Sequence, residues 1–247
     1  MNYKNYLKNG KSKIAVWGSG YIGLSTMAFF SKNKIKCVGF DIDQKKVDII
    51  NSGKLPIKEL KDWFGFDIRS SVKKKYLQAT SDHNIFNDNS FNVHFIAIPT
   101  EKNGKPYFDI LFDVLKKLVT IIKKKNKVKP VIIIESTLTP QCSEKKIIPF
   151  FKKYSLVPGK DFIYGVAPRR DWFVEGTKSL VDIDRVFGST DSVSSKIIKN
   201  ILSIVCKNLH EASSHKVSEM VKSIENAYRH MEITLANQLS LAYPNEN

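Results

Sequence analysis

The chain has 247 residues, 42% of them hydrophobic, so it can bury a proper core and allows one or two domains. No apolar run approaches the roughly 20 residues that cross a bilayer, and the start of the chain lacks the apolar stretch of a signal peptide. We therefore expect a cytoplasmic protein without a membrane-spanning segment.

The chain is strongly basic, with 40 Lys and Arg against 24 Asp and Glu and a formal net charge of +16. Such a charge suits nucleic acid, a membrane surface or an anionic ligand. The lysines, however, are scattered in twos and threes, with no aromatic-flanked basic stripe. We predict no nucleic-acid and no membrane partner, although a nucleotide ligand would benefit from the positive field.

The cysteines give no sign of a metal site or a disulfide framework, because the three of them are far apart in the sequence. Cys37 and Cys206 lie in apolar runs, where a small buried hydrophobe is expected. Cys142 follows a turn, and we expect it to be more exposed.

Strands and helices alternate along most of the chain after a polar leader over residues 1–11. Strands are expected at 13–18, 36–42, 93–100 and 131–137, and helices at 22–33, 43–53 and 108–126. The β-branched run at 131–137 is typical of a parallel strand buried on both faces. This alternation predicts an α/β fold, a Rossmann-like doubly wound parallel sheet over residues 12–190.

From residue 191 the pattern changes to helices only, one at 192–205 and one of more than 25 residues at 217–243. So long a helix is not easily stabilised alone. We expect residues 191–247 to form a helical connector and dimerisation segment. Its apolar residues would pack a homodimer: Met220, Ile224, Met231 and Leu235.

The strongest local signal is the glycine motif Gly18, Gly20 and Gly23, which follows a strand and opens a helix. These glycines would permit a tight turn, the approach of a pyrophosphate and close helix–strand packing. The helix N-terminus would offer free N–H groups to the phosphates. Asp41, at the end of the next strand, would accept the ribose hydroxyls and favours NAD over NADP. The competing interpretation is a glycine turn without a ligand. Asp43 is expected to cap the following helix.

Polar residues also follow two later strands. Thr100 ends one, and Ser136 with Thr137 ends the other. Open parallel sheets bind ligands at the carboxyl ends of their strands. Taken singly, these residues could merely cap loops; together with the glycine loop they converge on one crevice.

Lys222 and Asn226 are four residues apart on the long helix and therefore share one face. A lysine beside an amide can hold an anionic oxygen or pass a proton to a reacting alcohol. An ordinary solvated helix face explains the same spacing.

In chain order, six segments resemble the UDP-glucose/GDP-mannose dehydrogenase family of nucleotide-sugar 6-dehydrogenases. They are KIAVWGSGYIGL, VGFDIDQKKVDIINSGKLPI, FIAIPTEKNGKPYFD, VIIIESTLTP, DRVFGS and SEMVKSIENAYRHMEITLANQLSLA. The last is most similar to the branch acting on UDP-N-acetylmannosamine and related N-acetylated sugars.

The resemblance implies NAD-dependent oxidation of a sugar C6 alcohol to a uronate, as in polysaccharide biosynthesis, through a thiohemiacetal on a cysteine. It implies that NAD contacts Gly18, Gly20, Tyr21, Ile22, Gly23, Asp41, Lys46, Thr100, Ser136 and Thr137. It also implies a catalytic and substrate-binding face formed by Thr137, Lys222 and Asn226.

The sequence departs from the family after Pro168. The family usually has a glutamate there, in SPE or NPE, whereas this chain has Arg169. Arginine stays protonated and cannot act as a base. Glu175 matches a second family acid, and Asp171 is another substitute. Arg169 and Arg170 suit an anionic substrate, or are ordinary surface arginines.

The second departure concerns the catalytic cysteine and the UDP-binding domain, which in the family follow the long helix. This sequence ends there, and no cysteine lies beyond the helix. We expect the complete oxidation to need a partner chain that carries that C-terminal domain.

Three interpretations remain at this point. The first is a nucleotide-sugar dehydrogenase whose activity is incomplete in this chain. The second is a catalytically inactive NAD-binding module or subunit, favoured by Arg169. The third is a relative of the β-hydroxyacid dehydrogenases, which also join a Rossmann domain to a helix with Lys and Asn four apart and need no cysteine.

Overall fold

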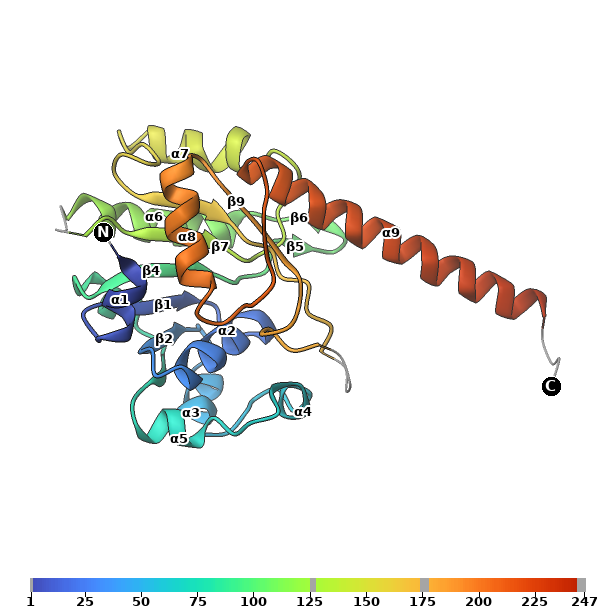
Figure 1. Cartoon of the computed structure of the whole chain (residues 1–247), viewed down its shortest axis with the longest axis horizontal. Helices are drawn as coiled ribbons and strands as arrows, with labels where there is room; N and C mark the ends of the chain where they lie inside the picture. The colour runs from blue at the N-terminus through green and yellow to red at the C-terminus, as the bar shows by residue number, and fades with distance from the viewer. Residues whose placement is uncertain (1, 125–127, 174–177, 244–247) are drawn as a thin grey trace.

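The computed structural model describes residues 2–124, 128–173 and 178–243. It contains an eight-stranded sheet in the order β10-β9-β8-β7-β4-β1-β2-β3, and a separate hairpin of β5 and β6 (Figure 1). The strands from β3 to β8 in this order are mutually parallel, whereas β9 and β10 run antiparallel to them. The predicted Rossmann-like doubly wound sheet is confirmed.

The strands are β1 (Lys13–Trp17), β2 (Cys37–Phe40), β3 (Leu77–Thr80), β4 (Phe91–Ile96), β5 (Glu101–Lys102), β6 (Lys105–Pro106), β7 (Val131–Ile134), β8 (Ile163–Val166), β9 (Arg185–Ser189) and β10 (Leu209–Glu211). The α-helices are α1 (Tyr3–Lys8), α2 (Tyr21–Lys32), α3 (Gln44–Asn51), α4 (Leu60–Phe64), α5 (Arg69–Lys73), α6 (Asp109–Lys123), α7 (Ile148–Lys152), α8 (Ser192–Leu202) and α9 (His215–Ala242). A 3-10 turn, η1, spans His83–Asn87, and a π-helical turn, η2, spans Ser143–Ile147.

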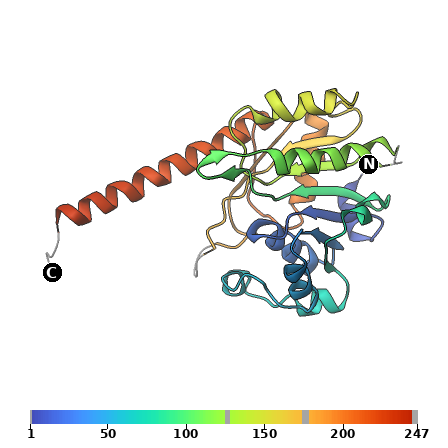
Figure 2. The ribbon, with the colours of Figure 1, turned by 180° about the vertical axis from the view of Figure 1, so that it is seen from behind.

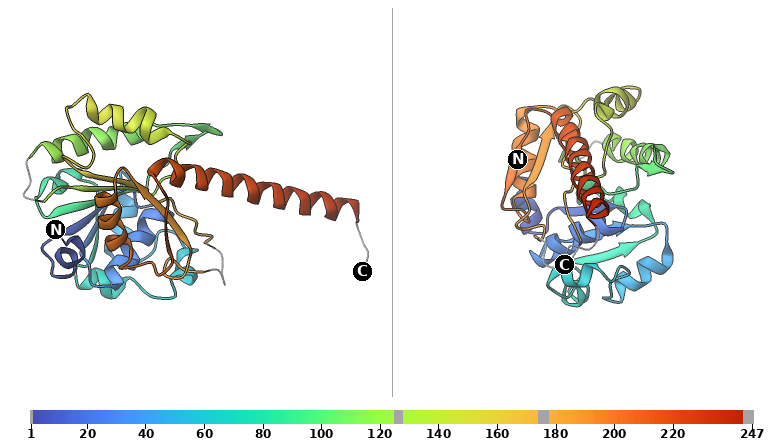
Figure 3. Two further views of the ribbon diagram at one scale, coloured as in Figure 1. Left: turned by 45° about the horizontal axis from the view of Figure 1, so that its top comes forward. Right: turned by 90° about the vertical axis from the view of Figure 1, so that its right-hand side faces the viewer.

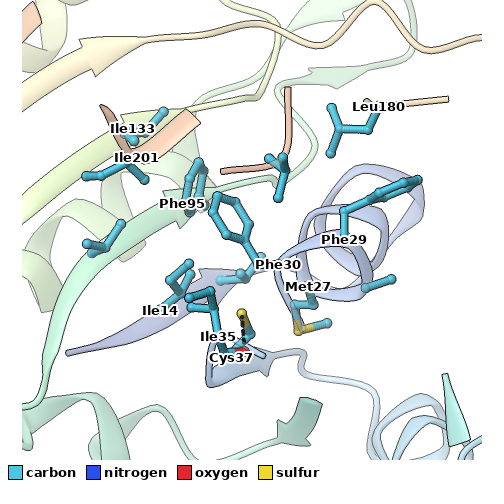
Figure 4. Close-up of a cluster of buried hydrophobic side chains, with 14 of the residues drawn as sticks. Ile14, Met27, Phe29, Phe30, Ile35, Cys37, Phe95, Ile133, Leu180 and Ile201 are labelled. Carbon is cyan, nitrogen blue, oxygen red and sulfur yellow. Dashed lines mark hydrogen bonds between the residues drawn. The ribbon is translucent and has the colours of Figure 1, made fainter. Parts of the chain in front are cut away.

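Apolar residues on both faces of the sheet form two separate cores. Along β1, Ile14 and Val16 belong to the core under α2, α3 and α8, whereas Ala15 and Trp17 belong to the core under α6 and α7. This alternation follows from the two-residue period of a strand. Figure 4 shows the first core, in which Phe30 of α2 lies against the sheet. Figure 2 shows α6 and α7 on the opposite face.

The segment 1–11 is more than the polar leader that its composition suggests. Residues 3–8 form α1, and its Tyr3 and Leu7 are buried. The Tyr3 hydroxyl also donates a hydrogen bond to the Lys129 carbonyl at 2.7 Å. Two apolar side chains one turn apart were enough to dock the segment on the first core.

The expectation of helices alone after residue 190 is wrong. α8 covers the sheet, and β10 pairs with β9 as its outermost strand. β10 has only three residues, two of them exposed, so it lacks the hydrophobic pattern of a strand. The sheet therefore extends past the predicted boundary, and α9 alone leaves it as a projecting arm (Figure 3). None of the helices in the described ranges is long and apolar enough to cross a membrane.

A buried histidine makes the fold sensitive to acid. His94 of β4 is fully buried, and the Trp17 indole N–H donates to its Nδ1 at 3.4 Å. Burial lowers the pKa of His94 to about 4, below its ordinary 6.5. Between these values the unfolded chain binds the proton more readily than the folded chain, so the free energy of unfolding falls as the pH falls.

We predict that acidification from about pH 6.5 to about pH 4 costs up to about 3 kcal/mol through this one group. Urea unfolding at several pH values measures the loss. In His94→Gln, the free energy of unfolding should fall less steeply as the pH is lowered over this range. If the pH dependence of the free energy of unfolding is unchanged in this variant, His94 is not its cause.

Candidate functional site

The glycine loop joins β1 to α2 with the geometry that the motif predicts. Gly18 has φ +94°, and a Cβ there would overlap the Ala97 carbonyl oxygen. A Cβ on Gly23 would overlap the Gly18 carbonyl, so this position also requires glycine. At Gly20, by contrast, a Cβ would meet nothing within 4 Å. The loop is therefore tight on its protein side and open at Gly20, where a ligand would approach.

The N-terminus of α2 is available to an anion. Its N-cap is Gly20, and no side chain caps the helix. The first backbone N–H groups of a helix, here those of Tyr21, Ile22 and Gly23, have no intrahelical acceptor. The 12-residue helix also directs a partial positive charge at this end. These donors suit a pyrophosphate.

Asp41 stands directly after β2, beside the glycine loop. Its carboxylate accepts hydrogen bonds from the Ser19 N–H at 3.0 Å and from the Lys46 ammonium at 2.9 Å. Among the described residues, the partner of its other oxygen is the Asp43 N–H, at 3.1 Å, which leaves this oxygen capacity for a ribose hydroxyl. Asp43 caps α3 as expected, because its side chain accepts from two N–H groups of the first turn.

The structure brings the other predicted strand-end residues to this same edge. Thr100 donates from its hydroxyl to the Thr137 carbonyl at 2.5 Å, joining the loops after β4 and β7. The Ser136 hydroxyl accepts from the Ile98 N–H at 2.9 Å and donates to the Ile98 carbonyl at 2.8 Å. Ser136 is thus occupied in holding the loop, whereas the side chain of Thr137 is exposed.

Two hollows in the described part of the surface lie elsewhere. One, of about 870 Å³, is bordered by Lys54, Lys61 and Arg69, and the other, of about 650 Å³, by Asp191 and Lys216. The glycine loop lines neither of them. The strand-end edge is the stronger candidate, because a glycine turn, the uncapped N-terminus of a 12-residue helix and the Asp41 carboxylate meet there.

The first residues of α9, from His215 to Glu219, are packed into the sheet domain, and we call them its root. Ser218 donates to the Val166 carbonyl at 3.0 Å, and buried Glu219 accepts from the Ser143 N–H at 2.9 Å. Burial raises the pKa of Glu219 above its ordinary value, although Ser143 opposes the shift. Sequence reasoning missed Glu219, because its neighbours one turn away, His215, Lys216, Lys222 and Ser223, are polar and resemble a solvated helix face.

Lys222 and Asn226 lie beyond this root. Lys222 is half-buried, and Asn226 is exposed. Burial lowers the pKa of Lys222 below its ordinary value, and the nearby Glu225 partly offsets this shift. An amine that gives up its proton more readily is suited to proton transfer with an alcohol.

The structure corrects the prediction that Arg169 binds an anionic substrate. Arg169 is only 4% exposed, and its guanidinium donates to Thr26, Ser25 and Asp171 at 2.7, 2.9 and 2.5 Å. Its donors are used within the protein. Arg170 is half-buried and already paired with Glu225 of α9 at 2.8 Å. The other proposed acid, Glu175, lies outside the described residues.

Arg169 belongs to a buried ionic cluster that sequence reasoning did not find. Glu135, directly after β7, accepts from Arg185 of β9 at 2.5 Å and from the Thr26 hydroxyl at 2.6 Å. Arg169 lies 3.6 Å from the same carboxylate. The cluster ties α2, β7, β9 and the loop after β8 together. An acid directly after a β-branched run was the available signal.

Cys142 is buried, contrary to expectation, with 2% of its surface exposed. Burial raises the pKa of its thiol to about 11. Burial also raises the pKa of Cys37 and of Cys206. These thiols are therefore protonated and unsuited to nucleophilic attack near neutral pH. In the described part of the chain, no group of three or more His, Cys, Asp or Glu side chains could hold a metal ion.

Comparison with known proteins shows to which family the chain belongs. The sequence model of the UDP-glucose/GDP-mannose dehydrogenase family, NAD binding domain, matches residues 12–205. The chain belongs to this family. The cofactor of the domain is accordingly NAD, as the glycine loop and Asp41 predicted.

Named relatives cover nearly all of the chain. Protein CapL of Staphylococcus aureus is 33% identical over 239 residues, which cover 93% of this chain and 52% of CapL. The UDP-N-acetyl-D-mannosamine dehydrogenase of Campylobacter jejuni is 31% identical over 247 residues, which cover 94% of this chain and 57% of that enzyme. The chain thus spans about half the length of the curated relatives it matches.

Solved structures agree with the fold. The UDP-D-ManNAc dehydrogenase of Pyrococcus horikoshii superposes with a TM-score of 0.80 at 28% identity, covering 93% of this chain and 53% of that one. The UDP-N-acetyl-mannosamine dehydrogenase Cap5O of Staphylococcus aureus gives a TM-score of 0.78 at 24% identity, covering 94% and 54%. The match to Cap5O supports the fold alone.

Proposed function

We propose that this chain forms the NAD-binding half of a nucleotide-sugar dehydrogenase, which oxidises the C6 alcohol of a UDP-N-acetylhexosamine or UDP-glucose toward the uronate. The carrying observation is the half-buried Lys222, whose pKa burial lowers, on the helix that follows the family's NAD-binding domain. The names of the relatives support the substrate class. Uronates of this kind serve polysaccharide biosynthesis.

The residues around the glycine loop fit NAD by their chemistry. The open space at Gly20 and the uncapped N-terminus of α2 would receive the pyrophosphate, and Asp41 with Lys46 would hold the adenine-side ribose. Thr100 and Ser136 would hold the loops after β4 and β7 in place beside the cofactor. NAD supplies the acceptor for the hydride that leaves C6.

The catalytic work of this chain would fall to Lys222, Asn226 and Thr137. Lys222 and Asn226 would donate hydrogen bonds to the alkoxide that develops as the C6 hydroxyl loses its proton. Thr137, exposed in the loop after β7, would orient a water or the nicotinamide end. By sequence, Glu175 is the acid to compare with the family's glutamate. The cysteine step and the reading of the UDP group would belong to a C-terminal domain, on this protein or on a partner chain.

The test combines calorimetry with absorbance at the NADH band, using NAD and a panel of UDP- and GDP-sugars. Lys222→Ala should abolish any NADH formation while NAD affinity stays within about two-fold. Lys216→Ala, on the exposed face of the same helix, is the matched control and should change neither. Loss of NAD binding in Lys222→Ala would refute this division of labour.

A second candidate function is an NAD-binding subunit without catalysis of its own. Arg169 favours it, because this guanidinium stands in place of the family's glutamate and is buried in an ionic cluster. NAD binding without NADH formation by the chain and every sugar tested would support this function. No described contact favours a β-hydroxyacid dehydrogenase.

We also propose that α9 is the connector and packs a homodimer, the boundary lying at its start rather than at residue 190. A stripe of large apolar side chains along α9 is more than half exposed: Met220, Ile224, Tyr228, Met231, Leu235 and Leu239. An apolar stripe of this kind is normally covered by another helix.

The dimer predicts a mass of about two chains by light scattering at micromolar concentration. Leu235→Arg should shift the chain to the monomer, because a guanidinium would be buried without a partner. Lys216→Ala, outside the stripe, should remain dimeric. A monomeric wild-type chain would sink the proposal.

A further inference from the structure

The loop after β8 contacts the NAD-binding helix and the arm with alternate residues. Arg169 and Phe173 face α2: Arg169 donates to Ser25 and Thr26, and the Phe173 ring lies 5.1 Å from the Tyr21 ring. Arg170 and Trp172 face α9, where their partners are Glu225 and Arg229. Alternation is what an extended segment gives, since successive side chains point to opposite sides.

The inner side of this loop is firmly fixed. The Asp171 side chain is fully buried and accepts from the Arg169 Nε at 2.5 Å. Arg169 is held in turn by two hydroxyls of α2 and lies 3.6 Å from Glu135. Moving Arg169 would leave the buried Asp171 carboxylate without its cation, which is unfavourable inside the protein. The loop is therefore a rigid platform for whatever its outer side touches.

The outer side holds α9 at a second point beyond its root. Glu225 receives the Arg170 guanidinium at 2.8 Å, and the Arg229 guanidinium lies over the Trp172 ring at 4.9 Å. Lys222, Glu225 and Arg229 are three and four residues apart and share one face. All three are half-buried, whereas every residue of α9 described after Arg229 is exposed to solvent.

We propose that residues 169–173 form a two-sided strap that positions Lys222, with Arg170 and Trp172 as positioning residues. The root at Glu219 fixes one end of the Lys222 segment, and the strap fixes the other, so together they set the rotation of the helix. The role of Lys222 at the reacting alcohol rests on the proposed function. The strap itself is a property of this chain's loop, in which Arg169 replaces the family's glutamate.

The strap makes the burial of Lys222 depend on two contacts in which Lys222 takes no part, Arg170 with Glu225 and Trp172 with Arg229. If the strap is loosened, the Lys222 side chain gains water, and its pKa rises toward that of an ordinary lysine. A variant that leaves the charges in place isolates this effect. Trp172→Ala and Arg229→Lys both do so, because the first removes a neutral ring and the second keeps the cation but loses the flat stacking group.

The experiment is competitive acetylation of the intact chain across a pH series, with peptide mass spectrometry reading Lys222 against exposed Lys116. In the wild type, the midpoint for Lys222 should lie below that for Lys116. In Trp172→Ala and Arg229→Lys it should move up toward Lys116, with a several-fold drop in relative labelling at pH 8. Glu144→Gln, which breaks an exposed ion pair between Lys216 and η2, is the control and should leave the midpoint unchanged.

Either variant suffices if the other fails to fold, as judged by its thermal midpoint. An unchanged Lys222 profile in a folded Trp172→Ala or Arg229→Lys chain overturns the strap. The labelling needs neither NAD nor turnover, so its result is separate from that of the proposed function. If NAD titration fails while the Lys222 profile shifts, the strap stands and the enzymatic role falls.

Discussion

Gly20→Val is expected to weaken NAD binding at least about 100-fold, equivalent to about 2.7 kcal/mol, while leaving the fold intact. A side chain at Gly20 meets no protein atom within 4 Å, and the backbone there has an ordinary negative φ. The added methyl groups would instead fill the space that a pyrophosphate needs above the first turn of α2. Calorimetric titration measures the affinity, and a thermal melt checks the fold.

Gly23→Ala provides the contrast, because its Cβ would overlap the carbonyl oxygen of Gly18. This variant should lose thermal stability whether or not NAD is present. Wild-type affinity for NAD in Gly20→Val would mean that the cofactor does not lie over the glycine loop.

Glu135→Gln should destabilise the fold by about 3–5 kcal/mol, the usual cost of removing one partner from a buried ionic group. The Glu135 side chain is fully buried and is the carboxylate shared by Arg185 and Arg169. Without its charge, the cluster keeps two buried guanidinium groups and only the Asp171 carboxylate. The loss should appear in urea unfolding as a lower midpoint with an unchanged slope.

Asp182→Asn is the matched control, because it removes a carboxylate from an ion pair with Lys207 that is more than half exposed on both sides. Such a pair contributes at most about 1 kcal/mol. A Glu135→Gln chain as stable as Asp182→Asn would show that the cluster contributes little. Because the cluster also holds α2, any folded fraction of Glu135→Gln should bind NAD more weakly.

The parallel core could be predicted from sequence because several of its strands are continuous apolar segments. The segment Val131–Ile134 is buried on both faces, as is typical of a β-branched run between two helical layers. The glycine loop could also be predicted, since backbone atoms close to Gly18 and Gly23 leave no room for a side chain at either position. Local chemistry determines both features.

What could not be predicted depends on contacts between distant segments. β10 is a three-residue strand whose pairing with β9 comes from the register of the sheet, not from its own residues. Arg169 resembles a surface arginine in sequence, and only the fold places Ser25, Thr26 and Asp171 around it. The burial of Cys142 likewise follows from the packing of η2 and α9. The strand-end residues were predicted to converge, and they do, but their division between loop support and ligand contact is a tertiary property.

The measurement that tests the account most directly is calorimetric titration of the purified chain with NAD and with NADP. The glycine loop and Asp41 predict saturable binding of one NAD per chain and markedly weaker binding of NADP, whose 2′-phosphate the Asp41 carboxylate would repel. Absence of NAD binding, or equal affinity for the two cofactors, would contradict this account.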